Sequence, residues 1–247
     1  MTQRMAIVLA AGKGTRMKSD LPKVLCPVRG RPMVSYVLDA LRASRVGRIL
    51  VVVGYRSDLV REALRGRADV EFVEQTEQLG TGHAVLMCRA ELERHDGPVL
   101  ILTGDSPLTQ VASIEAVFGE YQNGRPACVL GTAHKVNPTG LGRIVRDGLG
   151  AFVSIVEEKD ATPAQRGLTE VNLSTYVFDS RLLVQALTDM RNDNRQKEYY
   201  LTDCPGILRA RGADVRALPV LKSCEALSIN TWDDLAIVEA ELERLGR

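Results

Sequence analysis

A glycine-rich turn and two nearby cations are the first residues in this chain whose types and spacing could do chemistry. The run Leu9-Ala-Ala-Gly-Lys-Gly-Thr-Arg-Met17 follows a short apolar segment, and Leu21-Pro-Lys-Val24 comes soon after it. Glycines at such a turn allow backbone N–H groups to approach a phosphate closely. Arg16 and Lys23 would add positive charge to that site. Gly12 and Gly14 alone would fit a turn that binds nothing equally well, so the cations carry the interpretation.

Two better-known phosphate motifs do not fit this turn. The dinucleotide fingerprint G-x-G-x-x-G matches Gly12 and Gly14 but requires a third glycine where Met17 stands. The Walker A motif requires Ser or Thr after its lysine, and Lys13 is followed by Gly14. The sequence of this turn therefore indicates neither a dinucleotide-binding site nor a P-loop.

A carboxylate follows a second apolar run. Asp105 comes after the segment 99–102 and Gly104, which places it at the end of a buried strand. Open α/β sheets bind ligands at the carboxyl ends of their strands, and carboxylate oxygens are ligands that Mg²⁺ prefers. An aspartate after glycine is also a common turn residue. Asp105 is thus a candidate metal ligand with an ordinary structural alternative.

The elements that must position these residues alternate along the chain. Apolar runs at 5–11, 49–53 and 99–102 predict strands, and helical spacing appears at 33–43 and 59–64. This order predicts an α/β fold: a Rossmann-like, mostly parallel central sheet with helices on both faces. Shorter strands at 127–130, 152–156, 172–178 and 215–219, with a hairpin around 140–148, predict a smaller mixed β extension, and 231–247 predicts a closing amphipathic helix.

Composition excludes several classes of protein. The 247 residues are 45% hydrophobic with a formal charge of +1, which excludes disorder and disfavours general attraction to nucleic acid or an anionic membrane. The five cysteines are widely spaced and predict reduced thiols. The apolar start at 5–11 is too short to span a membrane. We therefore expect a cytoplasmic protein with small-molecule partners; the sequence predicts no oligomeric state.

The turn and the cations resemble the signature of the sugar-nucleotidyltransferase family, A-A-G-x-G-T-R-M followed by L-P-K. Further segments match the family in order: 75–84, 104–108, 138–143, 156–161, 170–172, 198–203 and Asn230. Within the family, the motifs are most similar to the uridylyltransferase domains that make UDP-N-acetylglucosamine. The resemblance implies transfer of UMP from UTP to N-acetylglucosamine-1-phosphate, with release of pyrophosphate and with Mg²⁺ as cofactor.

The resemblance also implies a role for individual residues. Arg16 and Lys23 would be catalytic, and Asp105 and Asn230 would bind the metal. His83 is expected to be a structural residue at a helix start, because no second ligand lies near it. The nucleotide would be bound by Leu9, Ala11, Gly12, Gly14, Gln75, Gly80 and Thr81, and the sugar by Gly142, Glu157, Asn172 and Thr202.

The chain departs from the family beside the expected sugar site. The usual Asn-Thr-Gly triplet is Asn172-Leu173-Ser174 here. Regular alternation along a strand predicts that Leu173 points away from the pocket while Ser174 lies on the Asn172 side and narrows it. The identity of the sugar is consequently less well determined than the reaction class.

Two alternatives stay open. A transferase of the same fold could use another nucleotide, such as CTP or dTTP, although the match at 75–82 disfavours it. A catalytically silent, nucleotide-sensing relative should have lost charges that Arg16, Lys23 and Asp105 retain. We expect one nucleotidyltransferase domain over 1–247, with a nucleotide-binding core to about 130, a sugar-binding portion at about 131–230 and a helix at 231–247. The acetyltransferase β-helix domain of bifunctional relatives is not expected within it.

Overall fold

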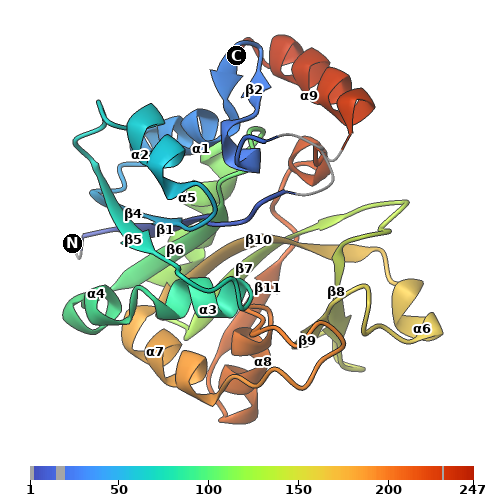
Figure 1. Ribbon diagram of the computed structural model, residues 1–247. Helices are drawn as coiled ribbons and strands as arrows, with labels where there is room; N and C mark the ends of the chain where they lie inside the picture. Colours follow the sequence, from blue (N-terminus) through green and yellow to red (C-terminus); the bar gives the residue numbers. More distant parts are fainter. Residues whose placement is uncertain (1–2, 15–19, 230) are drawn as a thin grey trace.

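A computed structural model describes residues 3–14, 20–229 and 231–247 of the chain. Arg16 and Asn230, two of the predicted site residues, lie outside the described residues. The described part has a twisted sheet between two layers of helices, with a β extension on one side (Figure 1).

The sheet is built on parallel strands. Its main path has the order β11-β7-β10-β6-β1-β4-β5, and β8 and β9 extend it from β10. Strand β1 pairs in parallel with β4 and β6, whereas β10 runs antiparallel to both β6 and β7. The strands are β1 (Met5–Ala10), β4 (Arg48–Val53), β5 (Val70–Glu74), β6 (Pro98–Thr103), β7 (Cys128–His134), β8 (Gly142–Arg146), β9 (Phe152–Val156), β10 (Glu170–Asp179) and β11 (Val215–Leu218).

Alternating side chains of the strands fill two cores. In β1, Met5 and Ile7 face one core, while Ala6 and Val8 face the other. The first core is covered by α3 (Thr81–Leu86), α4 (Arg89–Arg94), α7 (Ser180–Asp189) and α8 (Asp203–Ala210). The second is covered by α1 (Met33–Ala43), α2 (Ser57–Ala63) and α5 (Val111–Gln122). Because both faces are covered, the strand sequences are nearly continuous apolar runs.

Smaller elements surround this sandwich. Strands β8 and β9 form a hairpin, and α6 (Pro163–Arg166), which lies between β9 and β10 in the sequence, contacts β8. Strands β2 (Pro27–Val28) and β3 (Arg31–Pro32) form a separate two-stranded sheet. Helix α9 (Trp232–Arg244) begins at a capping box between Thr231 and Asp234 and packs against β2 and α1. Short 3-10 helices are η2 (Lys23–Leu25) and η3 (Ser223–Ala226).

The structure confirms the predicted fold class, with differences in individual elements. Strand β7 continues to His134, four residues beyond the predicted end at Leu130. Strand β5 was not predicted, because its sequence Val-Glu-Phe-Val-Glu lacks a regular apolar period at the half-exposed edge of the sheet. Helices α3, α4, α5, α7 and α8 were also not predicted. All five cysteines are free and buried. Within the described residues, no helix is long and apolar enough to span a membrane.

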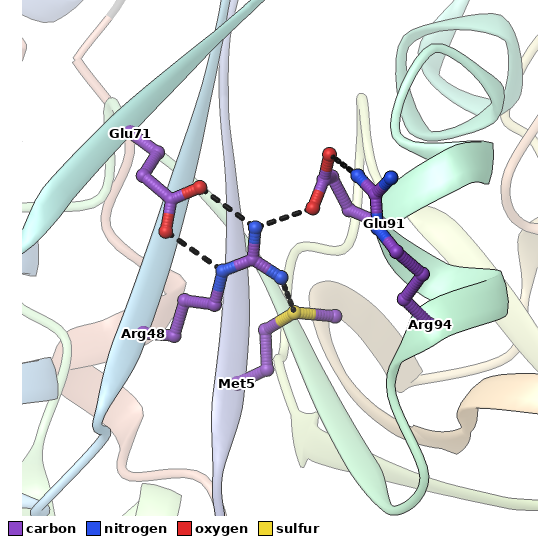
Figure 2. Close-up of polar contacts among 5 residues, drawn as sticks. All are labelled: Met5, Arg48, Glu71, Glu91 and Arg94. Atoms are coloured by element: carbon purple, nitrogen blue, oxygen red, sulfur yellow. Dashed lines mark hydrogen bonds and ion pairs between the residues drawn. The ribbon is translucent and has the colours of Figure 1, made fainter.

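An ion-pair network joins the starts of the strands to helix α4 (Figure 2). The Arg48 guanidinium donates to both carboxylate oxygens of Glu71 at 2.7 Å and to Glu91, which also accepts from Arg94. The Arg48 hydrogen bonds lower the pKa of the Glu71 and Glu91 carboxyls. Since Met5 pairs with Arg48 at the first position of β1, this network lies at the sheet edge opposite the carboxyl ends.

We expect Arg48→Met to lower the free energy of unfolding by about 1 kcal/mol at pH 7, because two partly exposed ion pairs are lost. Carboxyls with a lowered pKa in the fold stabilise it above their unfolded pKa, and this contribution is lost as the pH falls. The difference between variant and wild type should therefore shrink towards pH 4. Urea denaturation at both pH values measures it, with Arg65→Met as the control, which removes an exposed ion pair between Arg65 and Glu62 at the end of α2. An equal difference at both pH values would contradict this assignment.

Candidate active site

The carboxyl ends of the parallel strands meet at one edge of the sheet. Leu9 of β1 pairs with Thr103 of β6, and Val53 of β4 pairs with both Ala10 and Glu74. A cavity of about 680 Å³ opens at this edge, a size typical of small-molecule sites. It is lined by nine of the predicted residues: Leu9, Ala11, Gly12, Gly14, Lys23, Gln75, Gly80, Thr81 and Asp105.

The glycine-rich turn packs directly on the lysine that follows it. Gly14 has a φ of +65°, a left-handed conformation that favours glycine. A Cβ at this position would lie 2.4 Å from the Cβ of Lys23, so a larger residue would displace the lysine. The turn therefore requires glycine at position 14 both for its backbone conformation and for its contact with Lys23.

Lys23 and Asp105 form an ion pair inside the cavity. The Nζ of Lys23 lies 2.6 Å from the Oδ2 of Asp105, and the two side chains are 18% and 28% exposed. The pair joins η2 to the loop after β6. Two segments that are distant in sequence therefore meet in the cavity at the carboxyl ends of the strands. The positive charge that faces the Asp105 carboxylate in this structure is therefore the Lys23 ammonium group.

The donor set suits a hard divalent cation only together with a substrate. The Asp105 carboxylate offers oxygen ligands at the lining of the cavity. Among the described residues, no group of three or more His, Cys, Asp and Glu side chains could hold a metal by itself. A metal at Asp105 would need further oxygens, which substrate phosphates supply.

A buried amide ties the end of β5 to the loop before α3. The Nε2 of Gln75 donates to the carbonyl of Gly80 at 3.1 Å and lies 3.0 Å from Nδ1 of His83. Gln75 is only 3% exposed, so these contacts fix its side chain at the rim of the cavity. His83 fits the structural role predicted for it, since its contact here is with Gln75.

This loop is in turn bonded to a segment from the second half of the chain. Tyr199 N donates to the carbonyl of Leu79, and Gly82 N donates to the carbonyl of Tyr199, both at 2.8 Å. Gly80 has a φ of +107°, and a Cβ there would lie 2.6 Å from the Tyr199 carbonyl oxygen. The close approach of the two segments therefore requires glycine at position 80.

The four predicted sugar-binding residues lie together next to the cavity rather than in its lining. Gly142 of β8 pairs with Asn172 of β10, and the Oγ1 of Thr202 donates to Oε1 of Glu157 at 3.0 Å. A Cβ on Gly142 would lie 3.6 Å from the Cβ of Asn172 and 3.7 Å from Oε1 of Glu157. Glycine at position 142 thus keeps space open between an amide and a carboxylate.

Acidic groups gather around this cluster. Burial raises the pKa of the Glu157 carboxyl, partly offset by the Thr202 hydrogen bond and reinforced by Asp160 and Glu198. Burial, with the nearby charges of Glu157 and Asp160, raises the pKa of Asp203 to about 6. A further negatively charged group would be repelled by these carboxyls, whereas neutral hydroxyl groups could donate hydrogen bonds to them.

The strand beside Asn172 is irregular, which corrects the prediction made from alternation. A bulge breaks the pairing of β10 with β7 between Asn172 and Thr175, and Ser174 has a φ of 56°. The Ser174 N–H donates to Oδ1 of Asn172 at 3.2 Å. Leu173 packs in an apolar cluster with Val171 and Leu141, and Leu141 also lines the cavity, so the orientation of Leu173 away from the pocket stays a prediction. The prediction of regular alternation at Ser174 was wrong, because the bulge places this residue in left-handed backbone.

Several residues of the cavity were not assigned from the sequence. They are Ala10, Val24, Gln78, Ala84, Thr103, Lys135, Thr139, Gly140, Leu141, Glu198 and Ser228. Lys135 follows directly on β7, and a cation at the carboxyl end of a strand was the available signal. It was missed because the predicted strand ended at Leu130.

Comparisons with known proteins agree with this geometry. Residues 6–198 match the profile of the family described as "MobA-like NTP transferase domain". The chain is 44% identical over 240 residues to the bifunctional protein GlmU of Listeria monocytogenes serotype 4a (strain HCC23), covering 97% of this chain and 52% of that protein. It is 43% identical over 236 residues to GlmU of Streptococcus agalactiae serotype III (strain NEM316), covering 96% and 50%. The chain thus spans about half the length of the curated relatives it matches.

A solved structure shows the same fold. It is a putative glucose-1-phosphate thymidylyltransferase from Bacillus anthracis in complex with a sucrose, with a TM-score of 0.77. The match covers 96% of this chain and 94% of that chain at 17% sequence identity. At this identity the likeness concerns the arrangement of the elements alone.

We expect Glu157→Gln to raise the free energy of unfolding at pH 7, because the amide removes a charge that burial disfavours. A carboxyl with a raised pKa in the fold costs stability above its unfolded pKa, so the gain should vanish below about pH 4.5. Denaturation curves across this pH range measure the effect. The adjacent Glu158 has a lowered pKa through its hydrogen bond to Arg143, so Glu158→Gln should be destabilising at pH 7. Equal signs for the two variants would contradict the assignment.

Ser174→Gly should stabilise the protein by about 0.5–1 kcal/mol, because glycine adopts left-handed backbone without the steric cost that serine bears. Thr175→Gly, one residue further and outside the left-handed region, should instead be destabilising. Chemical denaturation of both variants at pH 7 provides the measurement. A Ser174→Gly variant less stable than wild type would show that the serine side chain contributes more than the backbone costs.

Proposed function

Because the chain belongs to the MobA-like NTP transferase domain family, we propose that it is a sugar-1-phosphate nucleotidyltransferase. The proposed reaction transfers UMP from UTP to N-acetylglucosamine-1-phosphate and gives UDP-N-acetylglucosamine and pyrophosphate. The observation that supports the proposal most strongly is that two groups of predicted site residues lie next to each other at one edge of the sheet. There a cavity with a glycine-rich turn, Lys23 and Asp105 borders the cluster of Gly142, Glu157, Asn172 and Thr202.

The cavity fits a nucleoside triphosphate. Backbone N–H groups of the turn around Gly12 and Gly14 are suited to phosphate oxygens, and Lys23 is suited to the charge that develops at the α-phosphorus. The family resemblance adds Arg16 to these cations. The loop fixed by Gln75, with Gly80 and Thr81, would recognise the base, while Leu9 and Ala11 would contact the nucleoside. The 44% identity to GlmU proteins supports UTP as the nucleotide.

The chemistry requires positioning and charge neutralisation rather than a protein nucleophile. A phosphate oxygen of the sugar phosphate attacks the α-phosphorus, a new P–O bond forms, and the bond to pyrophosphate breaks. The second pKa of such a phosphate is near 6, so at neutral pH it is mostly a dianion and needs no general base. The residues of the pocket hold the reacting phosphates in line and stabilise the added charge.

The acceptor half supports an amino sugar. Glu157 and Asn172 offer acceptors to sugar hydroxyls, and the amide of Asn172 can also donate to an acetamido oxygen. Gly142 keeps the space between them free of a side chain. Thr202 orients Glu157 through its hydrogen bond. The division into a nucleotide-binding core to about residue 130, a sugar-binding portion and the helix at 231–247 forms part of this proposal.

Enzymes of this family generally use a divalent metal ion. We propose Mg²⁺ at Asp105, with Asn230 as a second ligand by family resemblance. When bound, the ion would neutralise phosphate charge and polarise the α-phosphate. The Lys23 ammonium, which neutralises Asp105 in this structure, would then be available to the substrate phosphates.

The test of the proposed reaction is pyrophosphate release measured with four nucleoside triphosphates against several sugar-1-phosphates, each with Mg²⁺ and with a chelator. UTP with N-acetylglucosamine-1-phosphate should be the best pair, and the chelator should abolish the reaction. A stronger reaction with another nucleotide or sugar would keep the fold and change the substrate assignment. No release with any pair would remove the proposed activity.

Asp105→Asn should lower kcat by on the order of 10²–10³-fold and raise the Mg²⁺ concentration needed for half-maximal rate, because the amide cannot neutralise a cation. The unfolding temperature should change little, since the carboxylate is partly exposed in the cavity and lies outside the apolar cores. Kinetics over a Mg²⁺ titration, with thermal denaturation alongside, measure both effects. Asp69→Asn, which removes the partner of Arg42 away from the pocket, is the matched control. Unchanged metal dependence would remove Asp105 from the ligands.

A further inference from the structure

Lys135 is a charged residue of the cavity to which the proposed reaction has so far given no role. Among the described residues that line the cavity, Lys23, Asp105, Lys135 and Glu198 carry charge at neutral pH. Lys23 is paired with Asp105. Lys135 forms no ion pair with any carboxylate of the described residues; its Nζ donates to the carbonyl of Ala226 at 2.9 Å. An ammonium group has three N–H donors, so this contact leaves donors for a ligand.

The topology explains how this lysine reaches the pocket. Strands β6 and β7 both run antiparallel to β10, so they run in the same direction and end at the same sheet edge. Lys135 directly follows β7, and its backbone N–H donates to the carbonyl of Thr169, just before β10 begins. Both the backbone and the ammonium of Lys135 are therefore held in place.

The position of Lys135 separates it from the nucleotide-binding groups. It belongs to the segment that continues through Thr139, Gly140 and Leu141 in the cavity lining to Gly142 of the sugar cluster. The glycine-rich turn and Lys23 come instead from the part of the chain between β1 and the end of η2, and they line the cavity from there. A substrate that reaches from the turn to Gly142 must place its linking phosphates between these two groups.

Charge balance requires a cation at this junction. A nucleoside triphosphate and a sugar phosphate together bring several negative charges into a pocket that already holds Asp105 and Glu198. Lysine binds phosphate as a compact point charge with rotatable donors. We propose that Lys135 binds the phosphate group of the sugar-1-phosphate, which becomes the β-phosphate of the product. This assignment rests on the proposed function and adds a specific residue to its acceptor half.

Equilibrium binding tests the assignment without turnover. UDP-N-acetylglucosamine contains the phosphate donated by the acceptor, whereas UMP lacks it. Lys135→Met should weaken the affinity for UDP-N-acetylglucosamine by about 10- to 100-fold, the loss that corresponds to one charge-assisted hydrogen bond. Its affinity for UMP should stay within about twofold. Titration calorimetry of the full chain with both ligands measures this, and Lys135→Arg should restore most of the difference.

The control and the kinetics distinguish a phosphate contact from a structural role. Lys222→Met removes an exposed lysine near Ala226 that does not line the cavity, and should alter neither affinity. In steady-state kinetics, Lys135→Met should raise KM for the sugar-1-phosphate by a similar factor and leave KM for UTP nearly unchanged. If Lys135 acted only by tethering Ala226, both ligands would weaken together and the unfolding temperature would fall.

The outcomes separate this proposal from the one on which it rests. Wild-type protein that binds both ligands, with a variant that binds them equally well, would overturn the role of Lys135 and leave the proposed function standing. A variant with a raised KM for UTP alone would move the lysine to the triphosphate and overturn the acceptor assignment. Wild-type protein that binds neither ligand would overturn both.

Discussion

The direction of β10 decides which parts of the chain meet at the pocket. Because β10 runs antiparallel to β6 and to β7, the two flanking strands are parallel to each other across it. Strands β1, β4, β5, β6 and β7 therefore deliver their carboxyl ends to one edge, where β10 itself begins with Asn172 close to its start. Residues from distant parts of the chain, between Leu9 and Ser228, are assembled there.

The groups that stabilise the fold and the polar groups around the cavity lie in different parts of the structure. The two cores on either face of the sheet contain nearly only apolar side chains, and the Arg48 network lies at the opposite edge from the pocket. At the pocket, by contrast, carboxyls with raised pKa values gather beside Gly142, and Ser174 adopts a costly backbone conformation. These locally unfavourable features therefore lie beside the pair of Gly142 and Asn172 and not within the two apolar cores.

The sequence predicted the structure correctly where a local pattern of residue types is compatible with few structures. The apolar runs of β1, β4 and β6 form buried strands as predicted, and Lys23 and Asp105 both line the cavity at the carboxyl ends of these strands. It failed where neighbours in space decide the outcome. The edge strand β5 lacks a clear apolar period, and the limit of β7 depends on its pairing with β10. The bulge at Ser174 depends on the same pairing and hence could not be read from alternation.

The two main-chain hydrogen bonds between the segment 79–82 and Tyr199 join two parts of the chain that are distant in sequence into one mechanical unit. The amide hydrogens of Gly82 and Tyr199 are each protected from solvent by the other's segment. Neither can exchange through opening of its own loop alone; the segments must part for both. A ligand that orders one of these two segments would therefore also restrict the motion of the other, through the shared backbone hydrogen bonds.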